Sequence, residues 1–393
     1  MTEHQSSPKL LTLIMLTGLS VLAINMFLPS LAPIAEEFDV SMSTASLSLS
    51  VYLAITAVLQ IIMGPLSDLI GRRPVLLTGL GVFVIASIGC LFVTDFTTFL
   101  IFRILQGSVA SGMILSRAIV RDTTEGPDTT RVLGMIGTAM ALAPLLGPLM
   151  GGVLDQTFGW RANFAAYALM GGILFVICLR DLKETNLNRS ASFTAQFRNY
   201  STLIRSSVFW GWTLCLATGI GGFYLFISGV PGVAHHLGLS PAMTGFGIGI
   251  ISAGFMLGNF ITARNKGSGM RLIVIGRVIA VTGPFIALVF AIAGATSPFV
   301  LFAGGIAMGL GNGLSLPGAN ANVMSVNPKL AGSAAGLSGS LTVIVGAIAT
   351  PTSAYASTGD GGMIRLLALI TMIKVLSLIT VLLLARSNRD KPA

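Results

Sequence analysis

The chain has 393 residues, of which 53% are hydrophobic and only 9% are charged. Soluble domains carry roughly 25% charged residues, because a globule must cover its exterior with polar groups. The composition therefore excludes a water-soluble fold and indicates an exterior that faces lipid. The net charge of +9 could indicate a nucleic-acid partner, but the distribution of the basic residues, described below, argues against one.

Apolar stretches of about 20 residues recur along the chain, the length that a helix needs to cross a roughly 30 Å hydrocarbon core. Backbone groups in lipid must pair internally, so these spans are predicted to be helices. We expect an all-α membrane protein whose twelve transmembrane helices lie at residues 10–33, 44–66, 74–94, 97–120, 131–154, 162–180, 207–230, 241–263, 271–293, 297–320, 331–356 and 362–385.

Most of the 23 Lys and Arg residues fall in loops and tails on the side of the N-terminus, and the other side keeps only Arg161 and Arg365. Cytoplasmic loops carry such an excess of positive charge in multi-span membrane proteins. Both termini are therefore expected in the cytoplasm. The basic charge has a topological explanation, and no nucleic-acid partner is expected.

The spans divide into two groups of six. Residues 1–180 form the predicted N-terminal half and residues 207–393 the C-terminal half. The stretch 181–206 between them, rich in Arg, Asn and Ser, is interpreted as a cytoplasmic linker.

The two halves share short similarities at an offset of 199 to 200 residues. Phe-Leu-Ile-Phe at 99–102 recurs as Phe-Val-Leu-Phe at 299–302, and the segment 34–41 parallels the segment 233–240. Chance similarity among apolar helices is the alternative to a repeat. A repeat is favoured, and transporters with two repeated halves hold their substrate between the halves near the middle of the membrane.

A Gly- and Arg-rich segment ends the second span, with Gly64, Asp68, Gly71, Arg72 and Arg73 in the spacing G-x-x-x-D-x-x-G-R-R. Gly64 is expected to permit close helix contact. Asp68 can accept hydrogen bonds from Arg72 or from the N-terminus of a neighbouring helix. Such a cluster could hold the cytoplasmic side shut, whereas the simpler interpretation is a solvated turn.

The fourth span contains Arg103 and Gln106, which share one face of a helix because they are three residues apart. A charged side chain within a span is costly and indicates a functional site.

The fifth span contains Pro144, Gly147, Pro148, Gly151 and Gly152. A proline inside a helix removes a backbone hydrogen bond and bends the axis. The glycines are expected to allow tight contact between the halves, and an ordinary kinked helix is the alternative.

These three segments resemble the motifs of the major facilitator superfamily. Residues 64–73 resemble its signature loop, and residues 103–107 its fourth-span motif, in which the Arg faces the cavity and takes part in coupling. Residues 143–152 are similar to the antiporter motif of its drug exporters. Residues 25–31 and 116–122 resemble, more narrowly, the bicyclomycin and chloramphenicol exporter group.

The resemblance implies the major facilitator fold and export of small amphipathic, drug-like compounds by proton-coupled antiport and alternating access. It also implies a monomer in the bacterial inner (plasma) membrane, with protons and the lipid bilayer as its other partners. We expect no enzyme activity, cofactor or metal. The nucleotide-binding pattern G-x-x-x-x-G-K-[ST] does not occur in the sequence, which argues against ATP-driven pumping.

The chain departs from the exporter group at Asn25, where that group normally has a proton-carrying Asp. An amide cannot titrate. No Asp, Glu or His is predicted at mid-membrane. Asp155, which lies next to the fifth span, falls at the external end of that span. Basic residues do lie within spans: Arg103, Arg117 nearer the cytoplasm, and Lys374 in the middle of the twelfth span. Arg277 is expected to reach the cytoplasmic surface by snorkelling.

Three interpretations remain open. Asn25 is a neutralised proton site, natural or introduced, in an otherwise ordinary drug–proton antiporter. Alternatively, a basic cavity exports or exchanges an anionic metabolite, with Arg103 binding its carboxylate or phosphate. In the third, Lys374 is the titrating group, since a buried lysine can exchange protons near neutrality.

The residues that we expect to line the coupling site and the substrate cavity are polar, aromatic or Met side chains within spans. They are Asn25, Tyr52, Arg103, Gln106, Met113, Arg117, Met140, Tyr224, Asn312 and Lys374.

Overall fold

The computed structural model describes residues 8–123, 127–186, 202–264, 269–327 and 330–389. Within these ranges every regular element is a helix, so the predicted all-α class is confirmed. Most of the predicted linker at 181–206 lies outside the described residues.

The helices follow one another through both groups of spans, with short turns between them. They are α1 (Leu10–Asn25), η1 (Leu28–Ser30), α2 (Leu31–Glu37), α3 (Met42–Ile70), α4 (Arg72–Gly89), α5 (Phe96–Gln106), η2 (Gly107–Val109), α6 (Ala110–Thr123), α7 (Pro127–Phe158), α8 (Arg161–Asp181), α10 (Ser207–His236), α11 (Pro241–Arg264), α12 (Gly269–Ile292), α13 (Pro298–Ser325), α14 (Ala331–Ala356) and α15 (Gly362–Arg389).

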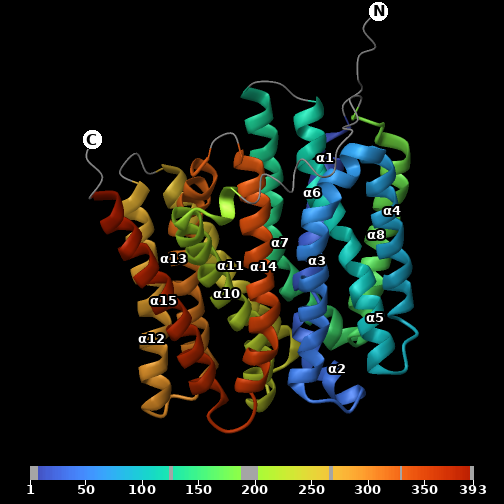
Figure 1. Ribbon diagram of the computed structural model, residues 1–393. Helices are drawn as coiled ribbons and strands as arrows, with labels where there is room; N and C mark the ends of the chain where they lie inside the picture. Colours follow the sequence, from blue (N-terminus) through green and yellow to red (C-terminus); the bar gives the residue numbers. More distant parts are fainter. Residues whose placement is uncertain (1–7, 124–126, 187–201, 265–268, 328–329, 390–393) are drawn as a thin grey trace, which may run out of the picture.

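Eleven helical segments of the described ranges are long and apolar enough to cross a membrane. The fifth span corresponds to α7, a further helix of 32 residues. Helices α1 to α8 and α10 to α15 stand beside each other as two bundles, and α1 begins and α15 ends at the same face (Figure 1). We call this the terminal face and the other the opposite face. The predicted fold of two six-helix halves is confirmed.

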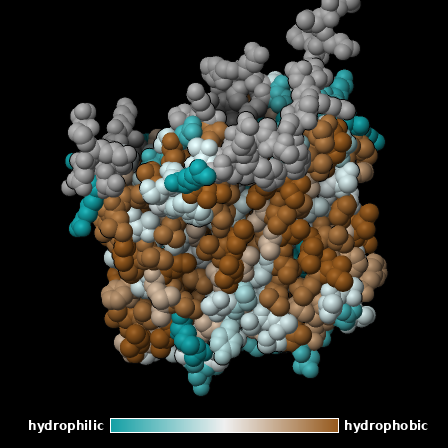
Figure 2. Space-filling view, in the orientation of Figure 1, coloured by the Kyte–Doolittle hydropathy of each residue, from teal (hydrophilic) through white to brown (hydrophobic). Residues whose placement is uncertain are grey.

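On the face drawn in Figure 2, apolar residues cover much of the middle, and hydrophilic residues gather toward the two ends. Many large apolar side chains of the described residues are exposed, such as Ile85, at 69%. Since a water-soluble protein would bury such side chains, this surface fits contact with lipid.

The first and fourth spans are each broken, although both were predicted as continuous helices. In the first, α1 ends at Asn25 and a short 3₁₀ turn containing Pro29 follows, because proline has no backbone N–H to continue the ladder. In the fourth, α5 ends at Gln106 and η2 begins at Gly107, whose α-carbon lies close to the Ile55 side chain. The breaks place Asn25 and Gln106 at helix ends inside the bundle.

The predicted repeat is visible where the first helix of each half ends. Asp39 (φ 49°) and Gly238 (φ 68°), 199 residues apart, both adopt the left-handed conformation. In each turn the next residue donates its N–H to the carbonyl five residues back, at 3.0 and 2.9 Å, a common way to end a helix. Equivalent sequence has thus produced equivalent geometry in both halves.

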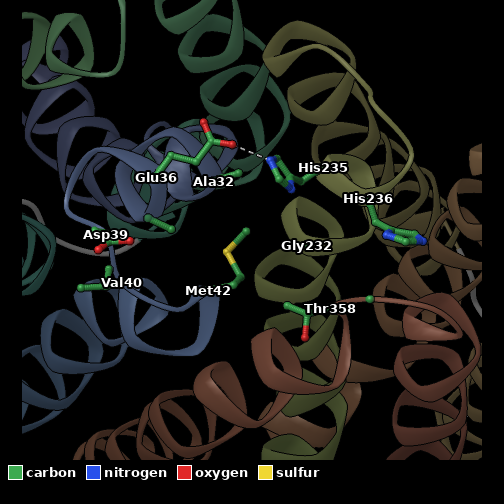
Figure 3. A pocket seen from close by; sticks show the side chains of 11 residues that line it. Ala32, Glu36, Asp39, Val40, Met42, Gly232, His235, His236 and Thr358 are labelled. Carbon is green, nitrogen blue, oxygen red and sulfur yellow. Dashed lines mark hydrogen bonds and ion pairs between the residues drawn. The ribbon is translucent and has the colours of Figure 1, made fainter.

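Two equivalent positions of the repeat also meet each other. Glu36 of α2 pairs with His235 of α10 across the junction of the halves at the opposite face, with 2.6 Å between Glu36 Oε1 and His235 Nε2 (Figure 3). Both side chains are more than half exposed, so the pair contributes little to stability. A cavity of about 370 Å³ lies beside it, lined in part by Asp39 and His236.

Two helix pairs join the halves, α3 with α14 and α7 with α11, and the packing of α7 on α11 uses glycine. A Cβ at Gly249 would lie 2.6 Å from the Leu145 carbonyl oxygen, and one at Gly245 would overlap the Pro148 carbonyl. In the opposite direction, a Cβ at Gly152 of α7 would overlap the Pro241 carbonyl of α11. The tight contact predicted for the proline- and glycine-rich segment is confirmed, and it closes the opposite face.

We expect Gly245→Val to separate the halves at the opposite face, because the added side chain overlaps the backbone of α7. The measurement is the rate at which a membrane-impermeant thiol reagent labels Ala32→Cys, a buried position beside the cavity. Labelling should become about tenfold faster, which corresponds to a decrease of roughly 1.4 kcal/mol in the free energy of local opening. Gly172→Val, where no atom lies within 4 Å of the added Cβ, is the control. Equal labelling in both variants would contradict the proposed closure.

Candidate functional site

Arg103 is fully buried near the end of α5 and is surrounded by rings. Its guanidinium carbon lies 4.1 Å from the ring centroid of Phe27 and 4.7 Å from that of Tyr52. Its Nη1 donates to Gln106 Oε1 at 2.5 Å, and its Nε donates to the Ser48 carbonyl at 3.3 Å. Cation–π contacts and amide oxygens thus replace a counter-ion.

Gln106 is held in place by a second helix. Its Nε2 donates to Ser87 Oγ in α4 at 2.8 Å, which leaves Oε1 directed at Arg103. The predicted shared face of Arg103 and Gln106 is confirmed. Within the described part of the chain, Arg103 forms no ion pair, and its Nη2 is buried without a hydrogen-bond partner. A charge buried in this way is costly unless a polar or charged group lies close by, so Arg103 is a candidate functional residue.

No hydrogen bond joins Asn25 to Arg103 among the described residues, although both were expected to line the coupling site. Its Nδ2 donates to the Val21 carbonyl of its own helix at 2.8 Å, and its Oδ1 is buried without a partner. The side chain faces α7, where a Cβ at Gly147 would lie 3.5 Å from the Asn25 Cβ. The break after α1 turns Asn25 toward the antiporter-like segment.

Asp155 lies near the opposite-face end of α7, as expected, and is buried, at 7% exposure. Its carboxylate lies near Ser30, which accepts a hydrogen bond from Asn163 Nδ2 at 3.0 Å. The Oδ2 atom of Asp155 has no partner. Because α7 continues to Phe158, the carboxylate lies inside the helix packing rather than in a loop.

A second basic cluster lies inside the C-terminal half. Arg277 of α12 and Lys374 of α15 are both fully buried. Arg277 Nη1 and Lys374 Nζ both donate to Asn312 Oδ1 of α13, at 3.2 and 3.1 Å, and Nζ also donates to the Gly219 carbonyl of α10 at 2.6 Å. The expected snorkelling of Arg277 is wrong, because Gly219 leaves room for the guanidinium inside the bundle.

The remaining predicted cavity residues lie apart from these two clusters. Arg117 Nη2 lies 3.1 Å from Met140 Sδ, joining α6 to α7, and Met113 is half-buried on α6. Tyr224 of α10 is buried against Gly346 and lies within electrostatic range of Tyr52. One tyrosine from each half therefore lies near the junction of the bundles.

At the terminal face, Arg72 joins three helices. Its Nη1 lies 2.5 Å from Asp68 Oδ1, as predicted, and its Nε lies 3.0 Å from Asp122 Oδ2 of α6. Gly71 has a φ of 111°, which L side chains rarely adopt. Gly64 makes no close helix contact, since no atom lies within 4 Å of a Cβ built there, so that expectation is wrong.

Glu184 completes this network from the segment after α8. Its Oε1 accepts the backbone N–H of Arg72 at 2.9 Å, and its Oε2 accepts that of Arg73 at 3.2 Å. A carboxylate at a helix N-terminus satisfies free N–H groups and complements the helix dipole. Sequence reasoning placed Glu184 in the linker, because no local pattern relates it to a helix more than 100 residues earlier.

We expect Glu184→Ala to lower the stability of the purified protein by about 1 kcal/mol, the usual effect of losing a helix cap. Thermal unfolding in detergent measures this as a lower midpoint. Lys183→Ala, at the exposed neighbouring residue, should leave the midpoint unchanged. Equal midpoints for both variants would show that the cap contributes nothing.

Comparisons with known proteins agree with this architecture. The sequence model described as Major Facilitator Superfamily matches residues 13–351. A chloramphenicol resistance protein of Pseudomonas aeruginosa is 33% identical over 262 residues, which cover 65% of this chain and 62% of that protein. Multidrug resistance protein D of Escherichia coli (strain K12) is 28% identical over 390 residues, 96% of each chain.

The fold also matches a solved structure, a bacterial homolog of the human lysosomal transporter Spinster in an inward-facing, occupied conformation. The TM-score is 0.78 over 98% of both chains, at 15% sequence identity, so this likeness concerns the fold alone. The motifs, the paired bundles and the matched family model agree: the chain is a membrane transporter that belongs to the major facilitator superfamily.

Proposed function

We propose that this transporter exports small amphipathic, drug-like compounds in exchange for protons, by alternating access to a site between its halves. The observation that carries the proposal is the contact of α7 with α11, where glycines of each half lie against carbonyl groups of the other. Two backbone surfaces can separate without breaking ion pairs, which suits bundles that rock. The relatives named for chloramphenicol and multidrug resistance support the substrate class.

The substrate is bound between Tyr52 and Tyr224, one ring from each half. Aromatic rings accommodate varied flat apolar compounds. Arg103 stacks on the Tyr52 ring, so a polar group of the substrate that approaches Tyr52 also approaches a positive charge. Substrate binding is thereby linked to the charge balance of the N-terminal half.

The terminal face is cytoplasmic in this proposal, because the basic loops lie there, and the protein acts as a monomer in the bacterial plasma membrane. The ion pairs of Arg72 with Asp68 and Asp122 join helices of the N-terminal half only. Among the described residues, the ion pair that crosses between the halves is Glu36–His235 at the opposite face. These contacts support a state in which the opposite face is held closed.

Export or exchange of an anionic metabolite is the second candidate. It is favoured by Arg103, Arg277 and Lys374, which are all fully buried and form no ion pair with a described residue. A carboxylate or phosphate of the substrate would then balance this charge.

The proposal predicts that purified protein releases protons when chloramphenicol is added, measured with a pH dye in weak buffer. Asn25→Asp, which introduces a titratable carboxylate at that position, should increase the release. Addition of solvent alone is the control. Release by Asn25→Asp alone would mean that this chain carries drug without proton exchange. If neither protein releases protons and transport depends on anions, the second candidate is favoured.

Arg103→Lys should reduce chloramphenicol export by tenfold or more. The expected loss corresponds to roughly 1–2 kcal/mol, the free energy of a desolvated cation–π contact together with the hydrogen bond to the Gln106 amide. Lysine keeps the charge but cannot present a planar fork to the rings and Gln106. Export from cells with matched protein levels is the measurement. Arg264→Lys is the control, because Arg264 stacks on Phe260 at the exposed end of α11. Full export by Arg103→Lys would remove Arg103 from the mechanism.

A further inference from the structure

The basic cluster of the C-terminal half has one positive charge too many for its surroundings. Arg277 and Lys374 are both fully buried and share a single acceptor, Asn312 Oδ1. The sequence from residue 207 to 393 contains only two acidic residues, Asp360 and Asp390, both outside the predicted spans. Two cations this close in a dry interior repel each other strongly.

The hydrogen bonds around Lys374 match an uncharged amine. Its Nζ has two acceptors, the Gly219 carbonyl at 2.6 Å and Asn312 Oδ1 at 3.1 Å. An ammonium group has three N–H donors and a neutral amine has two. Two acceptors satisfy the amine and leave one donor of an ammonium group without a partner. Arginine keeps its proton in proteins, so Lys374 is the member of the pair that can give one up.

The α10 helix is shaped to receive both side chains. A Cβ at Gly219 would lie 2.6 Å from Arg277 Nη1, and one at Gly222 would overlap Lys374 Cε. Asn312 Nδ2 donates to the Gly219 carbonyl at 3.3 Å, which fixes its Oδ1 between the two cations. Four helices thus build this cluster, with α10 supplying space and a carbonyl, α13 the amide, and α12 and α15 the two bases.

Among the described residues, no carboxylate or histidine is found beside Lys374. Arg277 faces it from α12, Asn312 from α13, and Cys215 lies within electrostatic range on α10. The only titratable residue of α14 is Tyr355, near its end at the opposite face. Asp155, the buried carboxylate among the described residues, belongs to the N-terminal half, beside Ser30.

We propose that Lys374 is the proton-exchanging residue of this transporter, and that Arg277 and Asn312 position it for that role. In the state described here the Lys374 amine is neutral beside Arg277. When the cluster is hydrated, the amine lone pair takes a proton from a hydronium ion, which becomes water, and the amine becomes an ammonium group. Substrate binding shifts the protein from that hydrated state to the closed arrangement described here, where repulsion from Arg277 returns the proton to water as hydronium. This inference rests on the proposed proton antiport and names the residue that performs it.

The first test measures proton release on addition of chloramphenicol to purified protein. Lys374→Met should lose at least nine-tenths of the release while it still binds chloramphenicol, since methionine fills the same space without a base. Asp155→Asn and Lys183→Met, the latter at an exposed lysine, should release protons as the wild type does. Undiminished release by Lys374→Met, or its loss in Asp155→Asn alone, would overturn the proposal and leave proton antiport standing.

The second test needs no substrate and separates this inference from the proposed function. If Lys374 gives up a proton on folding, the folded chain binds one proton fewer than the unfolded chain, so stability rises with pH up to the ordinary lysine range near 10. The thermal midpoint of the wild type should therefore rise by on the order of 2 °C or more, relative to Lys374→Met, between about pH 7 and pH 10.

Arg277→Gln is the matched variant for the second test, because it removes the repelling charge and keeps Lys374. Its midpoint should rise less with pH than that of the wild type. The same slope in the wild type and in Lys374→Met would show that the lysine is buried with its proton, which overturns the proposal. A wild type that shows the slope but releases no protons with chloramphenicol would keep the titrating lysine and contradict the proposed antiport.

Discussion

Burial of positive charge without a paired carboxylate is the constraint that organises the interior of this transporter. Arg103 and Arg277 are the two largest fully buried side chains, and each lies in a different half. The N-terminal half compensates with rings and an amide, whereas the C-terminal half has only an amide and a carbonyl around two bases. Electrostatic effects are strong in such an interior. A proton or a polar substrate group that binds there therefore changes the electrostatic energy of the buried charges in that half.

The contacts within the halves differ in kind from the contacts between them. Within the N-terminal half, Arg72 and Glu184 join α3, α4, α6 and the segment after α8 through charged hydrogen bonds. Between the halves, glycines of α7 and α11 lie against carbonyl groups. Charged hydrogen bonds thus join helices within the N-terminal half, whereas the contact of α7 with α11 is close packing of backbone on backbone. This difference allows the bundles to move as units.

The fold could be predicted from the sequence because span length and residue spacing are local properties. Arg103 and Gln106 were paired correctly, since residues three apart share a helix face. The snorkelling expected of Arg277 was wrong, and the contacts of Glu184 and the burial of Asp155 were missed, because their surroundings come from segments far away in the chain. The depth of Arg277 depends on the absent side chain of Gly219, and the break after Asn25 decides which helix that residue faces.

The pairing of Glu36 with His235 reflects the internal symmetry of the chain. The two residues occupy the same position in the repeat, and they meet where the halves adjoin. In a protein built from two identical halves, any residue at this position would face its own copy. A glutamate would then repel a glutamate, and a histidine would attract nothing. An attractive contact at such a point requires two different sequences, so the divergence of the halves is what allows a complementary pair to form on the axis that relates them.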